Sequence, residues 1–173
     1  EPQVLATMAV SGAAPAAALP GRLALATDLD AGASSSKRPI ELAMGMGGRS
    51  GGGGMGGGMG GGGAGMMGFT INGDSFDPAT TNIDVGAGTT EDWVITNTSP
   101  MDHPFHLHAW PFRVIGRTAG PADLPGWKDT VNVPAGGSVT IRVPFTDITG
   151  RTVYHCHILD HEDQGMMGVV DVA

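Results

Sequence analysis

Residues 154–167 read YHCHILDHEDQGMM and contain the only cysteine of the chain, Cys156, between two histidines. A third histidine, His161, follows five residues after the cysteine, and Met166 follows ten residues after it. The other three of the six histidines lie upstream in residues 103–108, which read HPFHLH. All six histidines therefore fall in two short segments, and we expect the fold to bring these segments together.

The residues that lead into Cys156 favour a β-strand. Residues 151–154 include threonine, valine and tyrosine, which are common in strands. Side chains on a strand point alternately to its two faces. If the strand continues to Ile158, His155 and His157 point to one face and Cys156 to the other. The cysteine can then bind one metal while its neighbours bind something on the opposite face, with only a short backbone path between them.

The residue types form two candidate ligand sets. A thiolate, two imidazoles and a weak thioether make up a blue-copper electron-transfer site. The residues that offer this set are Cys156, His103, His161 and Met166. A second set consists of four imidazoles, which suit copper, iron, nickel or zinc. Its members are His106, His108, His155 and His157.

Two other interpretations explain less of the pattern. A cysteine beside a histidine can be a nucleophile and its base, but adjacent strand residues diverge, so neither neighbour reaches the sulfur easily. A structural zinc site takes four ligands, whereas this pattern offers eight. Histidines buried without a metal are a still poorer explanation, because an apolar core rarely contains six of them.

Taken together, HPFHLH and HCHILxHEDxGMM resemble the carboxy-terminal copper signatures of multicopper oxidases. This group includes laccases, bilirubin oxidases and bacterial cuprous oxidases. The resemblance runs from about Phe69 to Val172. It implies that the type 1 copper is held by His103, Cys156, His161 and Met166. It also implies that the type 2 copper is bound by His106 and the type 3 pair by His108, His155 and His157.

The resemblance also implies an enzyme that uses O₂ as its electron acceptor. Single electrons would enter at the type 1 copper from a phenol, a bilirubin-like compound or Cu(I). They would cross Cys156 to the neighbouring histidines and reduce O₂ to water. Glu162 occupies the place of a proton-relaying glutamate. Met101, Asp102 and Asp163 flank the type 1 ligands and are candidate substrate contacts.

Bulk composition excludes several partners. The formal net charge of −8 argues against nucleic acid and anionic membranes as partners. No apolar run reaches about 18 residues, so we expect no membrane span. The single cysteine cannot form an internal disulfide bond. The family resemblance implies an extracytoplasmic location.

The domain organisation is predicted from composition and from the family resemblance. Residues 4–10 look like a strand, and the resemblance implies that the last strand of a preceding domain lies at this place. We therefore interpret residues 1–14 as the remnant of an earlier cupredoxin domain, and an ordinary amino-terminal arm is the alternative. Residues 15–36 have the small and polar composition of a linker. Residues 37–173 form the predicted carboxy-terminal domain. The resemblance implies two further H-x-H pairs for the copper cluster, and we expect an amino-terminal portion, bound as a separate chain, to carry them.

Residues 45–68 are rich in glycine and punctuated by methionine. Such a composition supports neither a helix nor a core, which indicates a flexible surface insertion. A second hypothesis is capture of Cu(I), because thioethers are soft ligands that select this ion.

The remainder predicts an all-β domain. Trp93 and Ile95 alternate with Asp92 and Val94, and turn signals separate the short strands. The predicted strands are residues 37–44, 69–72, 89–97, 112–117, 130–133, 138–145, 151–158 and 166–172. This pattern favours a β-sandwich or barrel, and the resemblance implies a cupredoxin-type Greek key. Pro104 is expected to keep His103 on a loop, and residues 160–164 to form one turn that brings His161 back towards Cys156.

Two rival functions remain at this point. A stand-alone blue-copper protein would need no second set of imidazoles. A copper-storage protein would use the methionines of residues 45–68 but would leave the histidine spacing unexplained.

Overall fold

The computed structural model describes residues 7, 9, 11–12, 34–46, 67–122 and 126–173. Within these residues the chain forms ten β-strands and one short helix. The elements are β1 (Ser36–Met46), β2 (Met67–Ile71), β3 (Ile83–Val85), β4 (Thr89–Asn97), β5 (His103–Leu107), β6 (Arg113–Arg117), β7 (Thr130–Val133), β8 (Ser138–Phe145), β9 (Gly150–Cys156), α1 (Leu159–Asp163) and β10 (Met167–Val172). No helix in these ranges is long and apolar enough to cross a membrane.

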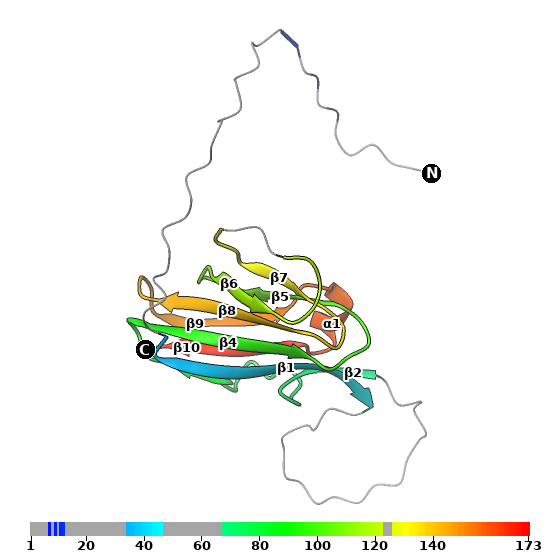
Figure 1. Ribbon diagram of the computed structural model, residues 1–173, viewed down its shortest axis with the longest axis horizontal. Helices are drawn as coiled ribbons and strands as arrows, with labels where there is room; N and C mark the ends of the chain where they lie inside the picture. The colour runs from blue at the N-terminus through cyan, green and yellow to red at the C-terminus, as the bar shows by residue number, and fades with distance from the viewer. Residues whose placement is uncertain (1–6, 8, 10, 13–33, 47–66, 123–125) are drawn as a thin grey trace, which may run out of the picture.

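The strands form two five-stranded sheets that face each other as a sandwich (Figure 1). One sheet has the order β2-β1-β4-β8-β6, and the other has the order β3-β10-β9-β5-β7. Most neighbours are antiparallel, but β1 pairs with β4 and β3 pairs with β10 in parallel. The predicted all-β sandwich is therefore confirmed, and α1 lies at one end of it (Figure 1).

The core lies between the sheets and follows the alternation read from the sequence. Every second residue of β8 is buried, beginning with Val139, and β4 shows the same alternation around Trp93. The indole of Trp93 contacts Phe105 and Tyr154 of the opposite sheet edge-on, with ring centroids 6.5 and 5.8 Å apart. Burying a large apolar side chain contributes about 1.5–3 kcal/mol, so these contacts hold the two sheets together.

One buried carboxylate joins β1 to β4 at this core. Glu91 accepts two hydrogen bonds of 2.9 Å from the Arg38 guanidinium and one of 2.8 Å from Trp93 Nε1. Burial alone would raise the pKa of Glu91, but the hydrogen bonds from Arg38 and Trp93 outweigh it and lower the pKa. These hydrogen bonds satisfy the buried carboxylate and hold β1 against β4.

The structure corrects four details of the sequence prediction. His103 and Pro104 are not on a loop, because they begin β5 and pair with Val133 and Asn132 of β7. Proline has an extended backbone that suits a strand, and its carbonyl still accepts a hydrogen bond of 2.8 Å from the His157 N–H. Strand β9 ends at Cys156 rather than at Ile158, since the chain then turns into α1.

The third and fourth differences concern short or glycine-rich segments. β3 was not predicted, and the two ends of the predicted insertion belong to strands. Gly45 pairs with Gly68, and Met46 pairs with Met67, across β1 and β2. The middle of the insertion and the predicted strand at residues 4–10 lie outside the continuous described segments.

Candidate metal centres

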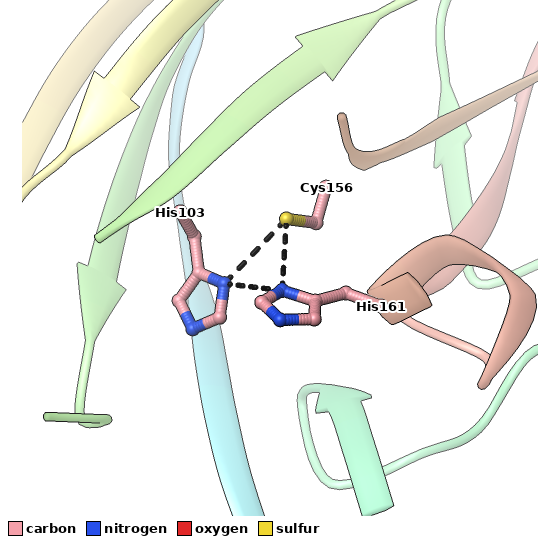
Figure 2. A group of neighbouring side chains, drawn as sticks. All are labelled: His103, Cys156 and His161. Atoms are coloured by element: carbon pink, nitrogen blue, oxygen red, sulfur yellow. Dashed lines mark hydrogen bonds between the residues drawn. The ribbon is translucent and has the colours of Figure 1, made fainter. Parts of the chain in front are cut away.

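The first centre is a buried group of one thiol and two imidazoles. Cys156 Sγ lies 3.5 Å from His103 Nδ1 and 3.5 Å from His161 Nδ1. The two Nδ1 atoms are 3.2 Å apart, and all three donor atoms converge on one point (Figure 2). The side chains come from three elements, because Cys156 ends β9, His103 begins β5 and His161 lies in α1. All three residues are at most 4% exposed.

Local backbone contacts bring these residues together. Phe105 pairs with Cys156 across β5 and β9, which places the start of β5 beside the end of β9. The short helix α1 then turns the chain back, with the His161 N–H donating to the Ile158 carbonyl. The Met166 N–H donates to the His161 carbonyl, and the Cys156 N–H donates to the Met166 carbonyl, at 2.9 and 3.0 Å. The predicted return of His161 towards Cys156 is what the structure shows.

The donor set fits a single metal ion of the blue-copper kind. Metal bonds of roughly 2.0–2.3 Å in a trigonal plane separate the donor atoms by about 3.5 Å, which is close to the distances seen here. Burial, and next the neighbouring His161, lowers the pKa of His103 to about 4. Burial also lowers the pKa of His161. Both rings are therefore neutral near pH 7 and have a lone pair to offer.

The Cys156 thiol must lose its proton before it can bind a metal ion. Burial raises the pKa of Cys156, and the Glu162 carboxylate adds to this effect. Because a thiolate is the metal-binding form, metal binding at this centre would release the thiol proton.

Met166 and Met167 differ clearly in their surroundings. Met166 is fully buried in the same core cluster as Cys156. Met167 is only partly buried and pairs with His155 across β9 and β10. Adjacent residues near a strand point to opposite sides, so burial favours Met166 as the thioether on the Cys156 side.

The second centre is a group of imidazoles from β5, β9 and the residues that follow them. Donor atoms of His106, His108 and His155 lie within 4.8 Å of one another. His108 Nε2 is 3.0 Å from His155 Nε2. The His157 ring is 5.3 Å from that of His106 and 5.7 Å from that of His155, measured between centroids. The four predicted imidazoles are therefore together, although β9 ends before His157.

Hydrogen bonds fix which ring nitrogen faces this centre. His106 Nδ1 lies 2.9 Å from the Asp129 carbonyl, and His155 Nδ1 lies 3.0 Å from the Cys156 carbonyl. A carbonyl only accepts, so each Nδ1 carries the proton and each Nε2 keeps its lone pair. Burial, with smaller effects of His106 and His155, lowers the pKa of His108. A pocket of about 330 Å³ opens beside His106 and His108.

The structure separates the remaining predicted site residues. Glu162 Oε2 is 3.2 Å from His155 Nδ1, so this carboxylate contacts the ring nitrogen of His155 that faces away from the second centre. Asp102 is exposed, but its two carboxylate oxygens accept hydrogen bonds from Asn132 Nδ2 at 2.7 Å and the Ala135 N–H at 2.9 Å. These two bonds lower its pKa. Met101 and Asp163 are exposed near the ends of β5 and α1.

Sequence reasoning missed two residues near the first centre. The Phe69 ring stacks on that of His161, with centroids 3.9 Å apart and an interplanar angle of 18°. The Ser99 hydroxyl contacts the far nitrogen of His103, Nε2, at 2.7 Å. Phenylalanine and serine have many roles in proteins, so neither residue gave a signal in the sequence.

Comparisons with known proteins agree with this geometry. The sequence profile of the family described as "Multicopper oxidase" matches residues 57–173. A multicopper oxidase of Staphylococcus haemolyticus is 39% identical over 109 residues, which cover 60% of this chain and 24% of the relative. A laccase of Haloferax volcanii is 42% identical over 108 residues, covering 60% of this chain and 19% of the relative. This chain thus spans about a quarter or less of the length of these relatives.

Solved structures show the same likeness. A multicopper oxidase of Campylobacter jejuni, described as a metallo-oxidase, has a TM-score of 0.65 at 31% identity, over 81% of this chain and 30% of that one. The McoA multicopper oxidase of Aquifex aeolicus has a TM-score of 0.66 at 28% identity, over 87% of this chain and 31% of that one.

Proposed function

This chain belongs to the multicopper oxidase family, and we propose that it is the carboxy-terminal copper domain of an oxidase that reduces O₂. The cupredoxin-type sandwich agrees with this family. One observation carries the proposal. Cys156 faces a buried two-histidine site, while its neighbours His155 and His157 belong to a second group of imidazoles. A single tripeptide therefore connects two metal centres.

The ligand assignment follows from the two groups. The type 1 copper ligands are His103, Cys156, His161 and Met166. The type 2 copper ligand is His106, and the type 3 ligands are His108, His155 and His157. The convergent Nδ1 and Sγ atoms support the first set, and the contact between His108 and His155 supports the second. These residues would hold copper, which would supply one-electron chemistry: four electrons from a reductant, together with four protons, would convert O₂ to two molecules of water.

The protein's own residues prepare this chemistry. The Cys156 side chain and the backbone of residues 155–157 form a short covalent path. Electrons would travel along this path from the first centre to His155 and His157. Burial of His103, Cys156 and His161 excludes water from the first centre. The Glu162 carboxylate is only partly exposed and lies 3.2 Å from the protonated Nδ1 of His155. From this position beside a ligand of the second centre, it would relay protons from solvent towards that centre.

This chain contains only part of the ligand set of the second centre. The three-copper cluster of the family has eight imidazoles, and four of the six histidines in this chain would belong to that cluster. We therefore assign the remaining four to two H-x-H pairs in an amino-terminal portion or chain. The pocket beside His106 and His108 is open to such a partner. The reducing substrate would be a phenol, a bilirubin-like compound or Cu(I), and the enzyme would act outside the cytoplasm.

A stand-alone blue-copper protein is the second candidate, but it leaves the converging imidazoles of the second centre without a role. Oxygen consumption by the native protein separates the two candidates. An electron-transfer protein turns blue but does not consume O₂ with a reductant, whereas an oxidase does both.

The substitution Cys156→Ser tests the type 1 assignment. A serine hydroxyl cannot replace the copper thiolate, so the intense blue absorption of the oxidised native protein should disappear together with the oxidase activity. A denaturation curve identifies any variant that is simply unfolded. Retention of the blue absorption by a folded Cys156→Ser protein contradicts the assignment.

A further inference from the structure

Ser99 has a buried hydroxyl that touches a proposed copper ligand from behind. The residue lies between β4 and β5 and is 3% exposed. Its Oγ is 2.7 Å from His103 Nε2, 2.8 Å from Asn97 Oδ1 and 3.0 Å from the Met101 carbonyl. His103 uses its other ring nitrogen, Nδ1, to face Cys156. The hydroxyl and the thiol thus contact opposite nitrogens of one imidazole.

The orientation of Asn97 can be deduced from its partners. Asn97 Nδ2 donates to the Met101 carbonyl at 2.7 Å and to the Val133 carbonyl at 3.1 Å. Carbonyls only accept, so the atom facing them must be the amide nitrogen. The oxygen, Oδ1, therefore points to Ser99, where it also accepts the Ser99 N–H at 2.9 Å. Asn97 is the last residue of β4, and the sheet holds it in place.

The direction of the serine hydroxyl follows from this arrangement. A hydroxyl has one hydrogen to donate. Asn97 Oδ1 and the Met101 carbonyl can only accept, so the hydrogen of Ser99 goes to one of them. What remains for His103 Nε2 is a lone pair of Ser99 Oγ. The Nε2 atom must then carry the proton and donate it, which leaves Nδ1 unprotonated.

We propose that Ser99 is a positioning residue that holds His103 in the tautomer and ring orientation needed to bind the type 1 copper through Nδ1. The inference rests on the proposed copper site and adds to it the residue that prepares one ligand before metal arrives. Through its hydroxyl, Ser99 connects the side chain of Asn97 at the end of β4 to the ring of His103 at the start of β5. Partners behind metal-binding histidines commonly fix the ring in this way.

A merely structural serine would give a different result from a positioning serine. Ser99 also closes the turn after β4 through the Met101 carbonyl, so its removal can reduce stability by itself. Only the positioning role predicts a change at His103. The experiment therefore needs readouts of the ligand and of the copper, as well as a denaturation curve.

The experiment compares the native protein containing this chain with three variants, Ser99→Ala, Ser99→Thr and Thr98→Val. Thr98 is a matched control, because its hydroxyl, one residue away, contacts the Leu42 carbonyl at 3.3 Å and not His103. Copper affinity of the blue site is measured by competition with a chelator, and its reduction potential is measured by titration. We expect Ser99→Ala to weaken copper binding by about 10- to 100-fold and to shift the potential. Ser99→Thr and Thr98→Val should match the native protein in both.

A second measurement needs no variant and no copper. The ¹⁵N spectrum of histidine-labelled, metal-free native protein reports which nitrogen of His103 carries the proton. We expect the proton on Nε2. A proton on Nδ1 overturns the inference, as does a folded Ser99→Ala protein with native copper affinity and potential, or an equal loss in Thr98→Val. A native protein without a blue copper site would instead overturn the proposed function, and the tautomer would still be a test of Ser99.

Discussion

Gly168 in β10 faces the ring of Tyr154, the residue that begins the Tyr-His-Cys-His sequence. A methyl group at position 168 would overlap the Cζ and Oη atoms of Tyr154 and lie 2.9 Å from its Cε2 atom. The two residues are cross-strand partners in β9 and β10, so neither backbone can move aside easily. The absence of a side chain at this position therefore allows the ring of Tyr154, which lies two residues before Cys156 on β9, to pack across β10.

We predict that Gly168→Ala lowers the free energy of unfolding by about 1–3 kcal/mol, which is the usual cost of forcing extra atoms into a packed core. Chemical denaturation of the metal-free protein measures this change. Gly116→Ala in β6 is the matched control, because its added methyl would lie 3.7 Å from the nearest atom, Thr140 Cβ. An equal loss in both variants would mean that strand glycines are needed for another reason.

The two neighbouring methionines are predicted to differ in their effect on the copper. Met166 is buried with Cys156, whereas Met167 is partly exposed. A weak axial thioether tunes the reduction potential of a blue-copper site. Met166→Leu should therefore raise the potential and keep the blue absorption, and Met167→Leu should leave both unchanged. A raised potential in Met167→Leu alone would move the ligand assignment by one residue.

The stability of the metal-free protein should depend on the buried imidazoles. The pKa of His103 is lowered from 6.5 to about 4, first by burial, so the unfolded chain binds its proton more readily than the folded one. The stabilising contribution is complete above about pH 6.5 and is lost as the pH falls towards 4. We expect the thermal midpoint of the metal-free protein to fall over this range. His103→Gln, which cannot be protonated, should flatten the fall; an unchanged slope would contradict the shifted pKa.

At the scale of the elements, alternation of residue types was sufficient for the central strands. The ranges predicted for β4, β7 and β8 agree with the structure, because each carries a repeated inward-facing apolar residue. β3 has only three residues, too few to show an alternation. β5 was hidden by Pro104, since a proline normally indicates a turn, yet here it occupies a paired strand position.

The candidate site was predictable to a similar extent. Cysteine, histidine and methionine have few common roles, so their spacing was enough to predict the two groups of side chains that the structure brings together. Ser99 and Phe69 belong to residue types with many roles, and they matter only because β2 and the end of β4 lie beside the ligands in space. Their contacts depend on the tertiary fold and could not be read from the chain.

The pairing of β1 with β2 permits a clean test of the glycine- and methionine-rich insertion. Met46 and Met67 are direct partners at the end of the two strands, so residues 47–66 can be replaced by Asn-Gly, which favours a two-residue hairpin turn. Loop length affects stability only weakly, by about 0.6 kcal/mol per doubling. We expect phenol oxidation to remain. If the methionines deliver Cu(I), cuprous oxidation alone should fall, while equal loss of both activities would indicate a structural role.

At the scale of the whole molecule, β5 and β9 carry residues of both centres on opposite faces. The peptide bond between His155 and Cys156 links the two centres covalently. Cys156 points into the sandwich and is fully buried, whereas His108 and His157 are exposed at the other centre. Phe105 pairs with Cys156, and the next residue pair, His106 and His155, contributes to the second centre. One register of two strands thus sets the geometry of both groups of ligands. A shift of one residue would exchange the faces and destroy both.

This separation predicts that each metal can be lost without the other. In the native protein, His108→Ala removes an imidazole 3.0 Å from His155 Nε2, so the second centre should lose copper and O₂ reduction should stop. The first centre has all its ligands elsewhere and should keep its blue absorption. Cys156→Ser should do the reverse, with the blue absorption lost and copper retained at the second centre. Metal analysis and the visible spectrum of both variants measure this. Loss of the blue absorption in a folded His108→Ala protein would mean that the centres are not independent, and that the ligands have been divided wrongly between them.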